Sequence, residues 1–268
     1  MIEEFKEKLK VFDKFHFEEE PHIYWWLDED GNRCQAETSM TALIESHAHP
    51  FDKQKIAGIV ARRDGIPVED VLAEWEYSNE LSKIKGTHIH AFNEYLWQGM
   101  NYKYPKDEII KKFGFDVLEP LWPRLIRIAQ KFYEDYKDRI IPIGLEQVVG
   151  DEEIGICGSI DFLCYSKKLK SLIIIDYKSN KEIKFEPYRN NKMTGCLSHL
   201  DDCNYIHYSL QLNGYQYILQ KKTGFKLNNR HFLIWMNEKN DDYIIYQTKD
   251  LYKEAKDMLL DYKRRKGK

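Results

Sequence analysis

The sequence has few cysteines for its length. Its five cysteines are Cys34, Cys157, Cys164, Cys196 and Cys203. The number is odd and no C-x-x-C pair occurs, which argues against a disulfide framework. Free thiols of this kind are typical of a reducing environment, so the sequence predicts an intracellular protein.

Long hydrophobic runs are also missing. No apolar stretch approaches the roughly 20 residues that a membrane-spanning helix needs. The first residues, MIEEFKEKLK, are charged and contain no apolar signal segment. We therefore predict a cytoplasmic protein without a membrane partner.

A strong net charge is lacking as well. The chain has 41 basic and 44 acidic residues, for a formal net charge of −3, so any nucleic-acid partner would need a locally basic surface. Residues 263–268 form one basic run. It could be part of such a surface, or it could be a solvated chain end.

The chain is rich in aromatic residues, which make up 14% of it. Most would pack in a core, although aromatics near a site could stack on bases.

Repeats and low-complexity tracts are absent, and the first half of the chain reads mainly as helix. A turn-like D-E-D-G predicts a hairpin over residues 22–36. Helices are expected over 38–47 and 53–63, from Pro67 to about Lys85 with Gly86 as the end, from there to about Trp97, and over 118–138.

The second half begins with β-branched and apolar stretches at 141–149, 155–166 and 171–179. Then follow a predicted helix over 204–222, a hairpin over 231–238 and 242–248, and a helix over 249–265. This order predicts an α/β fold: a mixed central sheet flanked by helices, with a mainly helical N-terminal lobe. We place the lobe at residues 1–85 and the core at 86–268, although no linker cleanly splits the chain.

Asp176 and Lys178 stand at the end of an apolar strand. Alternate strand residues face the same way, so both side chains project together while Tyr177 points away. A carboxylate and an ammonium there need partners or a role. One interpretation is a simple salt-bridged strand end; the other is a catalytic pair.

Asp161 lies on the preceding strand. If 155–166 and 171–179 form a hairpin in which Ser166 faces Ser171, Asp161 falls opposite Asp176. Two carboxylates so close repel each other unless a cation lies between them. Hard oxygen ligands suit Mg²⁺ or Mn²⁺. This inference depends on the register, because a slip of one residue would send Asp161 to the other face.

Further candidates lie on the neighbouring segments. Glu146 could add a third carboxylate, or it could be an exposed strand residue. His88 and His90 are two apart on a predicted helix, so at most one faces a shared site. Gln211 and Tyr215 are stacked one turn apart, where they could support a lysine or phosphate or simply form a packing stripe.

Together these pieces resemble the RecB-type branch of the PD-(D/E)XK nuclease superfamily. The matching pieces, in chain order, are G-T-H-I-H (86–90), Glu146, G-S-I-D (158–161), I-I-D-Y-K-S (174–179) and Q-L-N-G-Y (211–215). Residues 37–44 and 199–205 further resemble phage-borne members and the mitochondrial genome-maintenance exonuclease. The resemblance implies a restriction-endonuclease-like core.

It also implies roles for the matched residues. His90, Asp161 and Asp176 would be metal ligands, with the backbone carbonyl of Tyr177 as another. Lys178 would position or deprotonate the attacking water and stabilise the phosphorane. Glu146 would bind metal directly or through water. The motif that supports the lysine and the substrate would be Gln211 and Tyr215.

The implied activity is Mg²⁺- or Mn²⁺-dependent hydrolysis of DNA by an exonuclease that acts on DNA ends in recombination, replication or repair. Its partner would be DNA that is single-stranded or has free ends, and the match to phage-borne members also admits a phage protein working in a bacterial host. Two alternatives stay open: a structure-specific endonuclease on the same core, and an inert nucleic-acid-binding module.

One departure concerns the cysteines. Some family members hold an iron–sulfur cluster with cysteines after the nuclease core, but no cysteine follows Cys203 here, so we expect no such cluster. Cys196, His199, Cys203 and His207 could suggest zinc. Their spacings would place them on one helical stripe, which cannot surround a tetrahedral ion.

Overall fold

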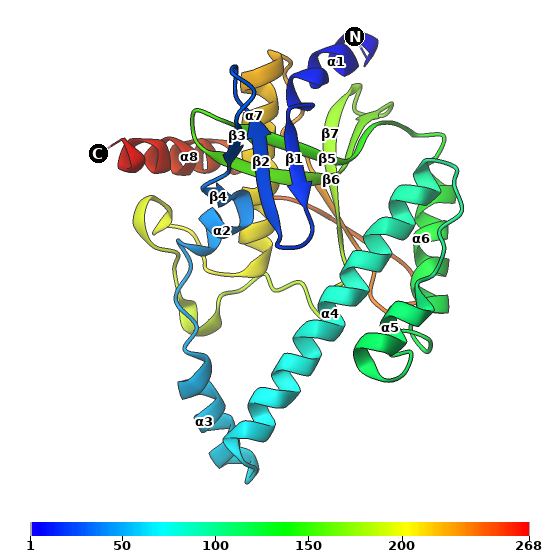
Figure 1. Cartoon of the computed structure of the whole chain (residues 1–268), viewed down its shortest axis with the longest axis vertical. Coiled ribbons are helices and arrows are strands. Elements are labelled where there is room, and N and C mark those ends of the chain that lie inside the picture. Colours follow the sequence, from blue (N-terminus) through cyan, green and yellow to red (C-terminus); the bar gives the residue numbers. More distant parts are fainter. Residues whose placement is uncertain (1, 268) are drawn as a thin grey trace.

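The apolar, β-branched stretches form the middle of a six-stranded mixed sheet (Figure 1). The structure is a computed structural model that describes residues 2–267. Strands β5 (Ile140–Asp151), β6 (Ile156–Ser166) and β7 (Ser171–Lys178) are antiparallel neighbours. Strand β8 (Phe232–Trp235) pairs with β7 in parallel, and β9 (Ile244–Gln247) pairs antiparallel with β8. The predicted α/β core with a mixed sheet is confirmed.

The hairpin of β6 and β7 has the predicted register, since Ser166 faces Ser171. A second partner of β6 is the short strand β4 (Thr38–Ser39), which runs parallel to its first residues. Because β5 occupies one edge of β6 along its length, β4 and β7 share the other edge. On that shared edge, residues 158–161 of β6 pair with no strand within the described part of the chain, and the candidate site lies beside this gap.

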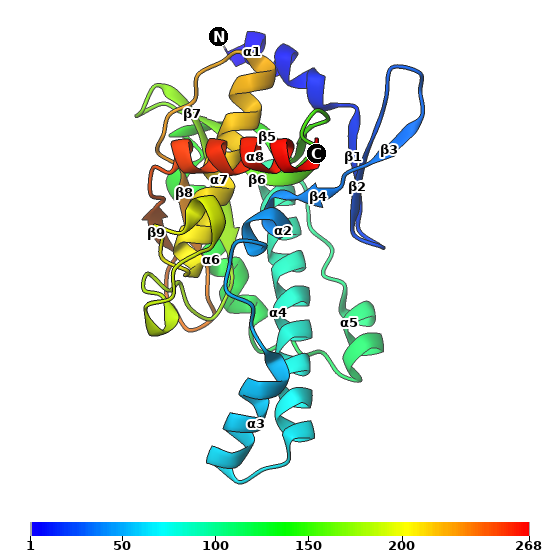
Figure 2. The ribbon, with the colours of Figure 1, turned by 90° about the vertical axis from the view of Figure 1, so that its left-hand side faces the viewer.

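Helices cover both faces of the sheet (Figure 2). Leu172 and Ile174 of β7 share a core with α7 (Asn204–Thr223) and α8 (Tyr252–Lys266). Ile173 and Ile175 face the opposite side, where they share a core with α6 (Trp122–Tyr136). Among residues 2–267, no helix combines the length and the apolarity that a bilayer span requires.

Helix α4 (Val68–Trp97) corrects the predicted break at Gly86. It is one continuous helix of 30 residues. Glycine weakens a helix by only about 1 kcal/mol, and this cost is easily outweighed by tertiary packing. Gly86 packs against the end of β7, where a Cβ atom would lie 3.8 Å from Ser179 Oγ. With α3 (Lys53–Asp64), α4 forms a helical hairpin that projects from the sheet (Figure 1), and we call it the α3–α4 arm.

The N-terminal region differs from the prediction in several elements. The expected hairpin is present as β2 (Ile23–Leu27) and β3 (Arg33–Gln35), but β1 (Phe15–Glu18) adds a third strand. The helix expected at 38–47 is present as the shorter α2 (Met40–Glu45). It begins at Met40 because the Ser39 hydroxyl caps it by accepting a hydrogen bond from Ala42 N–H. Helices α1 (Ile2–Leu9) and α5 (Lys106–Phe113) were not predicted. The division at residue 85 stays a prediction.

Candidate metal centre and active site

Carboxylates from neighbouring strands stand in a row across the sheet. The last ladder pair of β6 and β7 is Phe162 and Ile175, so Asp161 and Asp176 come next in register. Both are buried, with 9% and 2% of their surface exposed. Asp161 Oδ2 also accepts a hydrogen bond of 2.8 Å from the backbone N–H of Tyr177, which ties this carboxylate to β7.

Glu146 completes the row from β5. Its neighbour Gln147 faces Ile160, which leaves Glu146 opposite Asp161. The backbone φ of Glu146 is +45°, in the left-handed region that side chains other than glycine rarely adopt. Such strain is often stored at functional sites. The Ser159 hydroxyl donates a 3.4 Å hydrogen bond to Glu146 Oε2 and thereby helps to hold the carboxylate.

Helix α4 supplies a nitrogen to this row. His90 Nδ1 lies 3.3 Å from Asp161 Oδ2 and 3.8 Å from Glu146 Oε1. His88 instead points to Tyr102, whose hydroxyl is 2.8 Å from His88 Nδ1. Of the two histidines in the sequence motif, His90 is therefore the one that lies at the carboxylates.

Lys178 pairs with Asp176 at the end of β7. Its Nζ lies 2.5 Å from Asp176 Oδ2. Both side chains are largely shielded from solvent, so the structure holds this ion pair in a weakly hydrated place. An ionised carboxylate has about four lone-pair sites, so Asp176 can hold Lys178 and also accept a cation or a substrate group.

The electrostatics of the site reflect this crowding. Burial and the nearby Asp161 charge hold the pKa of Glu146 well above its usual range. Burial also raises the pKa of Asp176, against the opposing effect of Lys178. For Lys178, burial favours the neutral amine, but the charges of Asp176 and Asp161 outweigh it and raise the pKa. Carboxylates whose charges are mutually unfavourable form a place where a divalent cation would bind.

Helix α7 brings the predicted Gln211 and Tyr215 together, because Gln211 Nε2 donates a 3.3 Å hydrogen bond to the Tyr215 hydroxyl. Tyr215 is buried against Gly158 of β6, so closely that a Cβ atom there would lie 2.5 Å from its hydroxyl. Tyr215 thus lies against one residue of the unpaired segment of β6. It therefore fixes α7 against the strand that carries Asp161.

Sequence reasoning missed Tyr208. The Lys178 ammonium lies over its ring, 4.7 Å from the centroid, as a cation–π pair. Tyr208 precedes Gln211 by three residues on α7, a spacing that places both on one helical face and could have revealed it. Both line a cavity of about 240 Å³ between α2 and α7.

The residues present fit a divalent metal ion. One ligand atom from each of His90, Glu146 and Asp161 lies within 4.8 Å of the others. The carboxylate of Asp176, next to Asp161 in register, supplies a further donor. A ligand set of carboxylate oxygens with one imidazole suits Mg²⁺ or Mn²⁺, whereas sets rich in thiolates favour zinc. The Tyr177 carbonyl stays a predicted ligand.

The spacing of Cys196, His199, Cys203 and His207 predicted one helical stripe, but the structure does not place these four residues on a single helix. Helix α7 begins at Asn204, after Cys203, and Cys196 sits in the short 3₁₀ helix Gly195–Leu197. His207 Nε2 instead contacts Asp202 Oδ1 at 2.8 Å. These residues form no metal-binding group in the described part of the chain.

No protein-family model and no curated protein matches the sequence. Among solved structures, the chain is similar to a protein from Eubacterium rectale that carries the provisional name exonuclease, with 14% identity over 67% of this chain and 68% of that one and a TM-score of 0.35. It is also similar to a protein named SSO0001, with 13% identity over 96% and 84% of the two chains and a TM-score of 0.30. Likenesses this weak carry no argument, so the functional interpretation rests on the site.

Proposed function

We propose that the chain is a metal-dependent nuclease that hydrolyses DNA phosphodiester bonds. The observation that carries this proposal is the meeting of His90, Glu146 and Asp161 beside the buried pair of Asp176 and Lys178. A cluster of hard ligands next to one ammonium suits a reaction in which negative charge gathers on phosphate oxygens.

His90, Glu146, Asp161 and Asp176 would hold the metal. In an extended strand the N–H and C=O of one residue point to the same side, and the Tyr177 N–H points to Asp161, so the Tyr177 carbonyl is a further candidate. When bound, a divalent ion supplies the charge that polarises a phosphodiester and acidifies water. Mg²⁺ and Mn²⁺ are the ions that these donors favour.

Lys178 would bind and orient the scissile phosphate. Its side chain is only 17% exposed, so desolvation strengthens its attraction for a phosphate oxygen. Tyr208 limits where the ammonium can move, because its ring lies beneath it. Gln211 and the cavity beside it offer a polar wall and space for the nucleotide next to that phosphate.

The form of this activity that we favour is an exonuclease acting on DNA that is single-stranded or has free ends. Its support is the sequence resemblance to RecB-type nucleases. An endonuclease on the same residues and an inert DNA-binding module are the outcomes against which it is tested.

The test is cleavage of end-labelled linear and circular DNA, single- and double-stranded, with Mg²⁺ or Mn²⁺. We expect nucleotides to be released from linear DNA alone, and Asp161→Asn and Lys178→Ala to lower the rate at least about 100-fold, as the loss of a charge-stabilising group typically does. Asp138→Asn is the matched control, because Asp138 is exposed and outside the site. Cleavage of circles would identify an endonuclease. DNA binding without any cleavage, or full activity of Asp161→Asn, would refute the proposal.

A further inference from the structure

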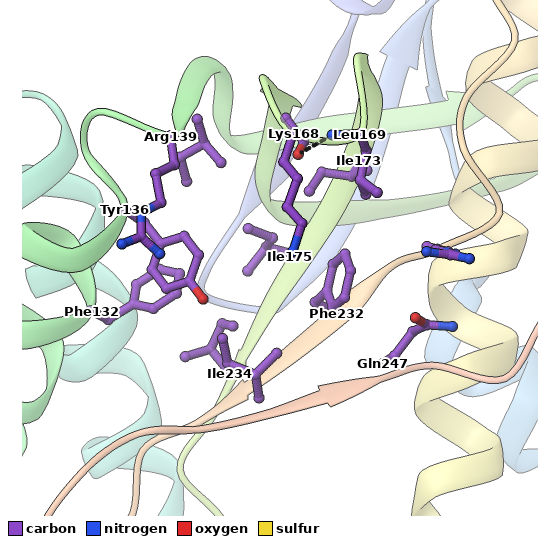
Figure 3. A pocket seen from close by; sticks show the side chains of 14 residues that line it. Phe132, Tyr136, Arg139, Lys168, Leu169, Ile173, Ile175, Phe232, Ile234 and Gln247 are labelled. Atoms are coloured by element: carbon purple, nitrogen blue, oxygen red, sulfur yellow. Dashed lines mark hydrogen bonds between the residues drawn. The ribbon is translucent and has the colours of Figure 1, made fainter.

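A second cavity lies on the opposite face of the sheet from the candidate site. It has a volume of about 340 Å³, at the small end of the roughly 300–1,000 Å³ typical of ligand pockets. Its walls come from the end of α6, the β6–β7 turn, and strands β7 to β9 (Figure 3). Ile175 lines it, whereas Asp176, the next residue of β7, faces the candidate metal centre. A ligand here would leave that centre open.

The floor of the cavity is apolar and its rim is basic. Ile175, Phe232 and Ile245 belong to the floor, and they offer a surface for a flat or branched apolar group. Arg139, Lys168 and Arg230 are the charged residues of the lining, and within residues 2–267 no carboxylate lines it. Figure 3 shows the Lys168 side chain extending from the β6–β7 turn toward Ile175.

The three cations are weakly balanced by protein carboxylates, since only Asp135 is close enough to attract Arg139 among residues 2–267. None of them forms an ion pair with another described residue, and Asp135, one helical turn before Arg139, is taken by Lys131 at 2.8 Å. Arg139 lies over the ring of Tyr136 instead, 5.5 Å from its centroid. Like charges around one cavity repel one another, and an anion between them removes that repulsion.

We propose that this cavity binds a small organic anion, with an aromatic or branched apolar body on the floor and a phosphate or carboxylate group between Arg139, Lys168 and Arg230. Both halves of the ligand are required. Inorganic phosphate has nothing to cover the floor, and a neutral ring leaves the cations unpaired. The proposal is independent of the nuclease assignment, because no residue of the candidate metal centre lines the cavity.

Isoleucine methyl NMR tests the proposal on the full chain in EDTA. Phenyl phosphate and phenylacetate are the anionic probes, and benzyl alcohol and inorganic phosphate are the matched controls. We expect at least one anionic probe to shift the methyl signals of Ile173, Ile175 and Ile245 and to leave Ile174, on the opposite face, unchanged. Failure of both anionic probes, equal affinity for benzyl alcohol, or shifts centred on Ile174 would overturn the proposal.

Charge variants provide the second readout. Lys168→Gln and Arg230→Gln are each expected to weaken the binding of the anionic probe about fivefold, the upper range for a partly exposed ion pair. Lys170→Gln is the control, since it removes the same charge from the same turn but does not line the cavity. If all three variants bind the probe equally, the basic rim does not recognise the anion and the proposal fails.

Discussion

At the scale of single residues, His231 is a buried histidine that the fold holds neutral. Its Nδ1 accepts a 3.1 Å hydrogen bond from Ile174 N–H, so the proton must sit on Nε2, which lies 2.9 Å from Gln216 Oε1. Burial lowers the pKa of His231 from 6.5 to about 3. A second proton would meet the Ile174 N–H, and protonation therefore opposes folding.

This arrangement predicts a pH dependence of stability. Above pH 6.5 neither the folded nor the unfolded state binds the proton, whereas between about 6.5 and about 3 only the unfolded state does. His231 should therefore reduce the free energy of unfolding by about 2 kcal/mol between pH 6.5 and pH 5. Denaturant titrations at both pH values, on wild type and His231→Gln, measure the difference. Identical losses in the two proteins would contradict a neutral, buried His231.

Tyr208 yields a prediction for catalysis. Its ring contributes a cation–π contact of about 1 kcal/mol that holds Lys178 in place. Tyr208→Leu should lower kcat about fivefold, while Tyr208→Phe keeps the ring and should stay near the wild-type rate. Steady-state kinetics on linear DNA, with Mn²⁺ affinity measured in parallel, separate this effect from metal loss. Equal rates for the Leu and Phe variants would show that the ring has no part in positioning Lys178.

Some of these residues could be placed from sequence and others could not. Asp161 and Asp176 could be paired because a four-residue turn fixes the register and alternation fixes the face. Glu146 could not, because a register shift between Pro142 and Gly144 and its own left-handed backbone follow no local pattern. Its opposition to Asp161 is a product of tertiary structure.

At the scale of elements, two glycines test how α4 and α7 meet the sheet. Gly86 lies inside a continuous helix with space for a methyl group, so Gly86→Ala should stabilise the protein by about 0.5–1 kcal/mol. Gly158 is pressed against Tyr215, so Gly158→Ala should destabilise it by about 1–3 kcal/mol. Chemical denaturation of both variants provides the measurement. A destabilising Gly86→Ala would speak against an unbroken α4.

Most elements of the sheet and of the helices that cover it were predictable from sequence. Strands β5 to β7 and helix α7 run for eight or more residues and were found from their patterns, and the shorter α2, β8 and β9 were found as well. Helices α1 and α5 have eight residues each, too few for a helical period to stand out. Helix α4 was split because a glycine signals a helix end locally, while the packing that overrides this signal is distant in sequence.

At the scale of the whole molecule, the sheet separates two sites. The carboxylates, Lys178 and α7 occupy one face, and the cavity with its basic rim occupies the other. His90 reaches the carboxylates from α4, the helix that continues into the α3–α4 arm. Local periodicity does not predict this crossing, because it joins residues more than fifty positions apart, and only the resemblance of the sequence motifs grouped His90 with Asp161.

The central claim is that His90, Glu146, Asp161 and Asp176 share a divalent metal ion. Anomalous diffraction from a crystal soaked in Mn²⁺ tests this claim most directly, with Asp161→Asn as the comparison. The account predicts one or two manganese peaks in contact with both Asp161 and Asp176, with His90 as a ligand, and their loss in the variant. Manganese elsewhere, or none between those two aspartates in the wild-type crystal, would contradict it.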